Sequence, residues 1–181
     1  MTTFLGVDSG AHGAAVLLDQ NGKVVLHKGN PRHIRFDRFT DEGIADWFES
    51  VQRQNGPFVI LERVWARPMN GARHAFGQGC NYGFLRGVFA VLDIKPADPT
   101  PSQWQKDLEI PPRKKGARKV NSRTKKEWVE GEETNEDFKK RLWAIAVQWS
   151  KIKGMERELA DAYLIAEWGR RQHQAAQGIK K

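Results

Sequence analysis

The 181-residue chain is long enough for one domain with a substantial core, and its charge is unbalanced. It carries 30 Lys and Arg against 22 Asp and Glu, a formal net charge of +8, and this surplus favours a polyanionic partner. The single cysteine, Cys80, excludes an intramolecular disulfide framework and fits a reducing, cytoplasmic location. No apolar run approaches the ~20 residues that span a bilayer, so no membrane partner is expected.

The first part of the chain predicts four strands and one helix. Apolar runs and period-two alternation indicate the strands, and Asn21-Gly22 is a strong signal for a hairpin turn into the third strand. An apolar stripe at helical spacing, with Thr40 or Asp41 as N-cap, predicts the helix. The expected strands cover 3–8, 14–19, 23–27 and 58–62, and the expected helix covers 41–54.

The remainder of the chain predicts mostly helices. The expected helices cover 72–91, 101–108, 135–150 and 156–173, and a short apolar run predicts a further strand at 94–97. The tail after Gln172 is expected to fray. This order of elements predicts an α/β fold with a mixed sheet flanked by helices. Its first three strands form an antiparallel meander and its later strands run parallel.

Most of the positive charge lies in one segment. Residues 101–126 hold nine basic side chains against two acidic ones, and they also contain Pro111-Pro112 and Gly116. The central part lacks apolar periodicity, which predicts a flexible basic arm at about 109–126 between two ordered regions. Such an arm suits phosphate groups, although a solvated charged loop without a ligand would have the same composition.

Two acidic residues end predicted strands at positions where the pattern expects an apolar side chain. Asp8 ends the first strand before a sharp turn at Ser9-Gly10, and Glu62 ends the apolar run 58–61. If these strands are parallel neighbours, both carboxylates lie at the carboxyl edge of the sheet, where α/β folds build their sites. Acids at strand ends also serve as turn or cap residues, so each position alone leaves a structural role open.

A third acid, Asp161, lies on the apolar stripe of the last predicted helix with Leu164, Ile165 and Trp168. An unpaired carboxylate there would be costly or would take up a proton, whereas a divalent cation or a partner arginine removes that penalty. Glu158 lies one turn earlier on a neighbouring face. Four carboxylates without a Cys/His cluster suit Mg²⁺ or Mn²⁺ rather than zinc.

Three short motifs, in order along the chain, resemble those of a known family. Gly6-Val7-Asp8-Ser9-Gly10 resembles the first-strand motif of the retroviral-integrase and ribonuclease-H-like superfamily. Glu62-Arg63-Val64-Trp65 and Glu158-Leu159-Ala160-Asp161-Ala162 are similar to the second and third motifs of RuvC-type Holliday junction resolvases. The segment 162–171 is similar to phage-borne members, which implies the host cytoplasm as location if the gene is viral.

The resemblance implies one ribonuclease-H-like nuclease domain over 1–175, with a disordered tail at 176–181. It implies a metal-dependent endonuclease that resolves four-way DNA junctions by paired nicks. The catalytic carboxylates, which also hold two Mg²⁺ or Mn²⁺ ions, would be Asp8, Glu62, Glu158 and Asp161. The family more commonly has Asp or His at the Glu158 position, and Glu156 is a less favoured substitute.

The resemblance also implies how DNA is bound. Trp65 holds the position at which the family places an aromatic residue that stacks on bases near the junction. The basic residues expected to contact DNA are Arg63, Arg67, Arg73, Lys106, Lys114, Lys115, Arg118 and Lys119. Three alternatives stay open: a less selective branched-DNA nuclease, a transposase-like relative, and a DNA-binding homologue without catalysis.

A homodimer is expected, because a four-way junction is two-fold symmetric and cutting opposed strands calls for two matching sites. Gly79, Gly83 and Gly87 recur every four residues in the helix predicted over 72–91. This stripe would let another backbone approach closely, and the family dimerises through the corresponding helix. Packing of the same stripe on the sheet is an equally good interpretation.

Overall fold

The computed structural model describes residues 2–10, 12–25, 33–64, 71–120 and 127–178, with the backbone alone at His74, 117–120 and 127–130. Its main sheet has the strand order β3-β2-β1-β4. The four strands are β1 (Thr3–Asp8), β2 (Ala14–Asp19), β3 (His33–Arg35) and β4 (Phe58–Leu61). The β1–β2 and β2–β3 pairs are antiparallel and the β1–β4 pair is parallel, which confirms the predicted mixed α/β sheet.

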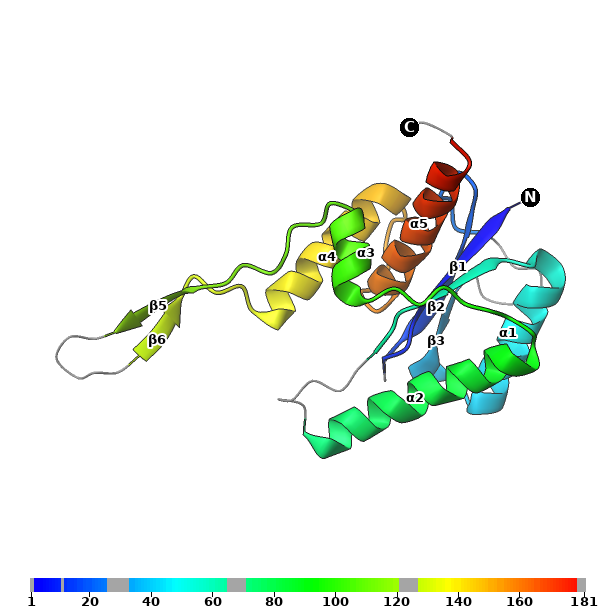
Figure 1. Ribbon diagram of the computed structural model, residues 1–181, viewed down its shortest axis with the longest axis horizontal. Coiled ribbons are helices and arrows are strands. Elements are labelled where there is room, and N and C mark those ends of the chain that lie inside the picture. The colour runs from blue at the N-terminus through cyan, green and yellow to red at the C-terminus, as the bar shows by residue number, and fades with distance from the viewer. Residues whose placement is uncertain (1, 11, 26–32, 65–70, 121–126, 179–181) are drawn as a thin grey trace.

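Helices cover both faces of this sheet (Figure 1). On one face lie α1 (Asp41–Asn55) and α2 (Ala72–Val91), and on the other lie α3 (Pro101–Asp107), α4 (Asn135–Ser150) and α5 (Leu159–Ala176). A single-turn 3₁₀ helix, η1 (Phe36–Arg38), follows β3. The predicted cap Thr40 is confirmed, since its side chain accepts a hydrogen bond from the amide of Gly43. None of the described helices combines the length and apolar character that a bilayer crossing requires.

Strand alternation divides the core into two layers. Phe4, Val16 and Ile60 pack on the side of α3, α4 and α5, whereas Leu5 and Leu17 pack on the side of α1 and α2. All five side chains are buried. The sheet is therefore buried on both faces, and the ends of its strands are the places where polar groups can gather.

The last helix lies unusually close to the sheet. A Cβ atom at Gly6 of β1 would overlap the carbonyl oxygen of Ala162 and the backbone nitrogen of Ala166 in α5. A Cβ atom at Gly169 would likewise overlap the side chain of Ile60. These two glycines let α5 cross β1 and β4 at backbone contact, which brings the start of α5 to the carboxyl end of β1.

Two predicted strands differ in the structure. The third strand of the meander is His33–Arg35. The predicted strand at 23–27 still begins beside β2, since the amides of Asp19 and Val25 donate to the carbonyl oxygens of Lys23 and Leu17, each at 2.9 Å, and Val24 bridges Leu18. Residues 26 and 27 lie outside the described residues. Ile34 is fully buried between two polar neighbours, the alternation of a half-buried strand. The run 94–97 forms a single parallel bridge, between Ala97 and Ile60, because Pro96 has no amide hydrogen for a ladder.

The last helix also differs from its predicted range of 156–173. It begins at Leu159, after a turn in which Gly154 has a φ of 74°, and it continues through Ala176 rather than fraying after Gln172. Glu156 is excluded from the helix and ion-paired to Arg35. The described part of α5 thus starts one turn later and ends one turn later than the pattern indicated.

The basic arm is not irregular throughout. β5 (Ala117–Val120) and β6 (Glu127–Glu130) form an antiparallel two-stranded sheet that Figure 1 shows extending away from the main body. The predicted range of 109–126 therefore stops before the second strand. Val120, Trp128 and Val129 have high strand propensity, but the surrounding charges obscured that signal.

Ion pairs anchor this hairpin at its base. The Glu133 carboxylate accepts hydrogen bonds from Nε and Nη2 of Arg141 in α4, at 2.9 and 2.8 Å, and from the amide of Lys114 at 3.1 Å. Arg141 also donates to the carbonyl oxygen of Pro111 at 2.8 Å, and Arg113 donates to the carbonyl oxygen of Glu133 at 2.6 Å. Charged and hydrogen-bonded groups therefore attach the arm to α4, and Ile110, at the start of the arm, is buried in the same core cluster as Leu142 and Ala146.

Candidate active site

A pocket of about 430 Å³ lies at the carboxyl ends of β1 and β4. Asp8, Glu62 and Asp161 all line it, so three of the four predicted carboxylates meet in one place. The remaining lining residues come mostly from α3, α4 and the segments after β1 and β4, and include Gly10, Arg63, Gln78, Gln105, Asn135, Phe138, Lys139 and Leu142.

The parallel pairing of β1 and β4 positions two of the carboxylates. Val7 is in register with Leu61, and the amide of Glu62 donates to the carbonyl oxygen of Val7 at 2.9 Å. Asp8 and Glu62 consequently leave the sheet side by side. The amide of Gly10 donates to Oδ1 of Asp8 at 3.0 Å and fixes that carboxylate against the turn.

Asp161 reaches the pocket from the first turn of α5. The residue as a whole is 7% exposed, which confirms the predicted burial of Asp161, and α5 is buried on all sides from Leu159 through Gly169. The partner of Asp161 is Lys139 of α4, whose ammonium donates a hydrogen bond to Oδ2. A lysine therefore does what the sequence reasoning assigned to an arginine or a metal ion.

The pocket disfavours further negative charge. Burial raises the pKa of Asp8, and the nearby charge of Asp161 raises it further, against opposing effects of Lys139 and the Gly10 amide. Burial and the charges of Asp8 and Asp161 raise the pKa of Glu62 to about 8. Desolvation would lower the pKa of Lys139, but the carboxylates hold it above its ordinary value. The three carboxylates thus require positive charge beside them.

This donor set fits a divalent cation in its chemistry. Carboxylate oxygens are the ligands that Mg²⁺ and Mn²⁺ prefer, and one lysine cannot neutralise three carboxylates. Over the described ranges, no three His, Cys, Asp or Glu side chains are arranged to hold a metal ion. Asp161 engages the Lys139 ammonium instead, so a cation would compete with Lys139 for that carboxylate.

The fourth predicted ligand lies apart from the other three. The Glu158 side chain is 37% exposed and its Oε2 lies 3.2 Å from Nη1 of Arg35 in β3. The less favoured substitute, Glu156, binds the same Nη1 at 2.6 Å and also pairs with Arg38. Neither glutamate lines the pocket in this conformation.

The predicted DNA-contacting residues are only partly described. Arg63 lies at the rim of the pocket and pairs with Asp98 at 2.9 Å, while Arg73 and Lys106 are exposed at α2 and α3. Lys114 and Lys115 are exposed at the base of the arm. Trp65 and Arg67 lie outside the described residues. Arg118 and Lys119 belong to β5, where only the backbone is described.

Sequence reasoning missed two residues of this site. Lys139 shares a stripe with Leu142 and Ala146, the two buried residues of α4, and a lysine in that stripe was the available signal. Trp104 donates from Nε1 to Oε1 of Glu62 at 2.8 Å, and nothing local in the sequence connects these two residues. Both contacts join separate elements, 22 and 42 residues apart, so they depend on the tertiary packing.

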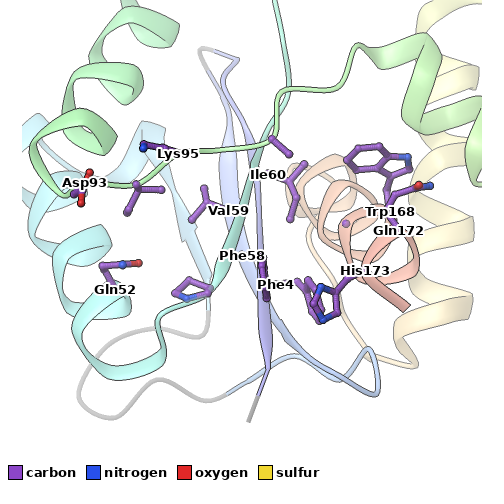
Figure 2. A pocket seen from close by; sticks show the side chains of 14 residues that line it. Phe4, Gln52, Phe58, Val59, Ile60, Asp93, Lys95, Trp168, Gln172 and His173 are labelled. Carbon is purple, nitrogen blue, oxygen red and sulfur yellow. The ribbon is translucent and has the colours of Figure 1, made fainter. Parts of the chain in front are cut away.

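A second pocket, of about 350 Å³, opens at the other end of the same strands. Figure 2 shows Phe4, Phe58 and His173 grouped there, with Ile60 and Trp168 on the side nearer α3. The ring centroids of Phe58 and His173 are 4.6 Å apart. Asp93 is the one carboxylate among the residues that line it, so this pocket lacks the acidic character of the first.

The sheet order and its covering helices define a RuvC-like, ribonuclease-H-like fold, and comparison with solved structures supports this. Thermus thermophilus RuvC in complex with a Holliday junction substrate matches with a TM-score of 0.59 and 15% identity, covering 100% of this chain and 99% of that chain. Another T. thermophilus RuvC structure matches with a TM-score of 0.56 and 14% identity, covering 99% of both chains. No family model and no curated protein matches the sequence.

Proposed function

We propose that this protein is a metal-dependent endonuclease of the phage-type RuvC class, which resolves four-way DNA junctions by paired nicks. The observation that carries the proposal is the meeting of Asp8, Glu62 and Asp161 in one pocket of a RuvC-like fold. The similar T. thermophilus protein was solved with a Holliday junction substrate. The surplus of positive charge fits a DNA partner.

Asp8, Glu62 and Asp161 would hold the ions, with Glu158 as the fourth ligand once it leaves Arg35. When bound, two Mg²⁺ or Mn²⁺ ions supply an activated water and stabilise the leaving 3′ oxygen. Lys139 keeps its proton on Nζ, because the neighbouring carboxylates raise its pKa. On release from Asp161 its ammonium is available to the phosphate being cut.

The arm and the pocket rim would hold the DNA backbone. Arg63 lies at the rim of the pocket, and Lys114 and Lys115 are exposed at the base of the arm. A two-stranded hairpin without further packing is marginally stable in water, so a DNA duplex beside β5 and β6 would stabilise it. Trp65, Arg67, Arg73, Lys106, Arg118 and Lys119 remain proposed contacts.

A homodimer through α2 would supply two sites with the symmetry of the junction. A Cβ atom at Gly79, Gly83 or Gly87 would meet nothing within 4 Å, so the glycine stripe does not pack on the sheet. Phe76 and Val91 on the same helix are 74% and 87% exposed. An apolar helix face with small residues at its centre suits a second copy of the same helix.

A synthetic immobile four-way junction tests the substrate. With Mg²⁺ or Mn²⁺, we expect symmetric nicks in two opposed strands that a ligase can seal, and no cutting of a linear duplex of the same sequence. Equal cutting of flaps, forks and junctions would indicate a less selective branched-DNA nuclease. Tight junction binding without cutting under either metal would indicate a DNA-binding homologue without catalysis.

A further inference from the structure

The buried side chain of Trp104 hydrogen-bonds a carboxylate of the candidate active site. Its side chain is 1% exposed and packs in the core layer shared by α3, α4 and α5. A buried indole N–H needs an acceptor, which a backbone carbonyl usually supplies. Here Nε1 donates to Oε1 of Glu62 at 2.8 Å, a carboxylate of the candidate active site.

The short helix that carries Trp104 is fixed relative to both carboxylate-bearing elements. Its lead-in segment runs beside β4, where the amides of Leu61 and Arg63 donate to the carbonyl oxygens of Ala97 and Pro99 at 2.8 and 2.9 Å. At its other end, Nε1 of Trp168 in α5 donates to Oδ2 of Asp107 at 2.9 Å. Helix α3 therefore bridges β4, which leads to Glu62, and α5, which carries Asp161.

A hydrogen bond from a fixed donor restricts a carboxylate in a specific way. It occupies one oxygen and sets the plane of the group, which leaves the second oxygen in a defined direction. It also stabilises the ionised form that a metal ion needs, against the burial and like charges around Glu62. Partners of this kind, outside the ligand set itself, commonly change metal affinity 10–100-fold.

We propose that Trp104 is a positioning residue, which holds Oε1 of Glu62 and presents the other carboxylate oxygen to a divalent cation shared with Asp8 and Asp161. This inference rests on the proposed metal-dependent function. It names a residue that would orient a metal ligand without binding the metal itself. It assigns to α3 the role of setting the position of Glu62 relative to α5.

The Trp104→Phe variant tests this, because phenylalanine keeps an aromatic core side chain but lacks the indole N–H. It is also smaller than tryptophan, so the effect of lost volume needs a control with the same substitution. Trp143→Phe is the matched control, since Trp143 packs against the same core cluster and donates from Nε1 to the carbonyl oxygen of Met155 at 2.8 Å. Mn²⁺ affinity is measured by calorimetric titration and stability by urea unfolding. We expect Trp104→Phe to weaken Mn²⁺ binding about tenfold or more and Trp143→Phe to leave it unchanged, at similar losses of stability.

A double-substitution test separates positioning from general damage. In a Glu62→Gln background, Trp104→Phe should cause no further loss of Mn²⁺ affinity. A further tenfold loss there, unchanged binding in the single variant, or equal loss in Trp143→Phe would each overturn the inference while leaving the metal site in place. Absence of Mn²⁺ binding by the unsubstituted protein would overturn the proposed function as well.

One measurement does not depend on whether Trp104→Phe folds. In ¹⁵N-labelled protein, Mg²⁺ titration should shift the indole N–H resonance of Trp104 and leave that of Trp143 in place. A Trp104 resonance that stays still at saturating Mg²⁺, while other signals of the pocket move, contradicts the positioning role.

Discussion

The ammonium of Lys139 donates a hydrogen bond to Oδ2 of Asp161, joining α4 to the first turn of α5 inside a pocket that also contains Asp8 and Glu62. The lysine side chain is 60% exposed, whereas that of Asp161 is 10% exposed. The pair therefore lies at the boundary between the acidic interior and solvent. A mobile cation can leave such a position when a divalent ion arrives.

Lys139→Gln should therefore strengthen Mn²⁺ binding, because the ion no longer competes with an ammonium group for Asp161. A solvent-screened pair contributes about 0.2–1 kcal/mol, so we expect up to about fivefold tighter binding by calorimetric titration. Lys140→Gln is the control, since Lys140 pairs only with Glu136 and Asp137, each at 3.8 Å, among the described contacts. Weaker Mn²⁺ binding by Lys139→Gln would show that the lysine supports the ions rather than competing with them.

Gly6→Ala should destabilise the fold, because the added methyl group would overlap backbone atoms of Ala162 and Ala166. Backbone cannot move aside as a flexible side chain can, and overpacking of this kind costs about 1–3 kcal/mol or more. Urea unfolding measures the loss. Gly77→Ala is the control, since its Cβ meets nothing within 4 Å and alanine favours a helix, so its stability should not fall.

Acid should weaken the attachment of the arm. The hydrogen bond from Arg141 lowers the pKa of Glu133 from 4.5 to about 2, although desolvation opposes the shift. A carboxylate with a lowered folded-state pKa stabilises fully above its unfolded pKa and loses that contribution as pH falls through the folded value. The difference in melting temperature between the unsubstituted protein and Glu133→Gln should be constant from pH 7 to 5 and shrink between about pH 4.5 and 2. A difference that grows as the pH falls would contradict this assignment.

Gly83→Glu should convert the proposed dimer to a monomer without harming the protomer. The new side chain has open space around its Cβ and removes a helix-interior glycine that costs about 1 kcal/mol relative to alanine. A charged residue at the centre of an apolar helix face would repel its symmetric copy. Sedimentation velocity measures the outcome, and a variant that remains dimeric, or an unsubstituted protein that sediments as a monomer, would remove α2 as the interface.

The positions of three carboxylates could be predicted because each depends on a local pattern. Asp8 and Glu62 end apolar strand runs, and the structure makes those strands parallel neighbours. Asp161 lies on the apolar stripe predicted for the last helix, although the structure buries every residue of α5 from Leu159 through Gly169. Apolar alternation in strands and apolar stripes in helices can be read from the sequence alone, without the tertiary fold.

The contacts of these carboxylates could not be predicted, because they join separate elements whose packing no local pattern shows. Arg35 of β3 forms an ion pair with Glu158. The sequence predicted the third strand at 23–27, which does not include Arg35, so this ion pair could not be predicted. Lys139 and Trp104 come from two further helices. The hairpin of the arm was missed for a different reason, since eight strand residues among many charges carry little apolar periodicity.

Cleavage by Asp8→Asn tests the central claim most directly. Asparagine keeps the size and the turn contact of Asp8 but removes its charge, so the fold should remain while the ions lose a ligand. With a four-way junction and Mg²⁺, the unsubstituted protein should produce paired nicks that EDTA abolishes, and Asp8→Asn should produce none while still binding the junction. Nicking by Asp8→Asn at the rate of the unsubstituted protein would contradict the assignment of this pocket as the catalytic centre.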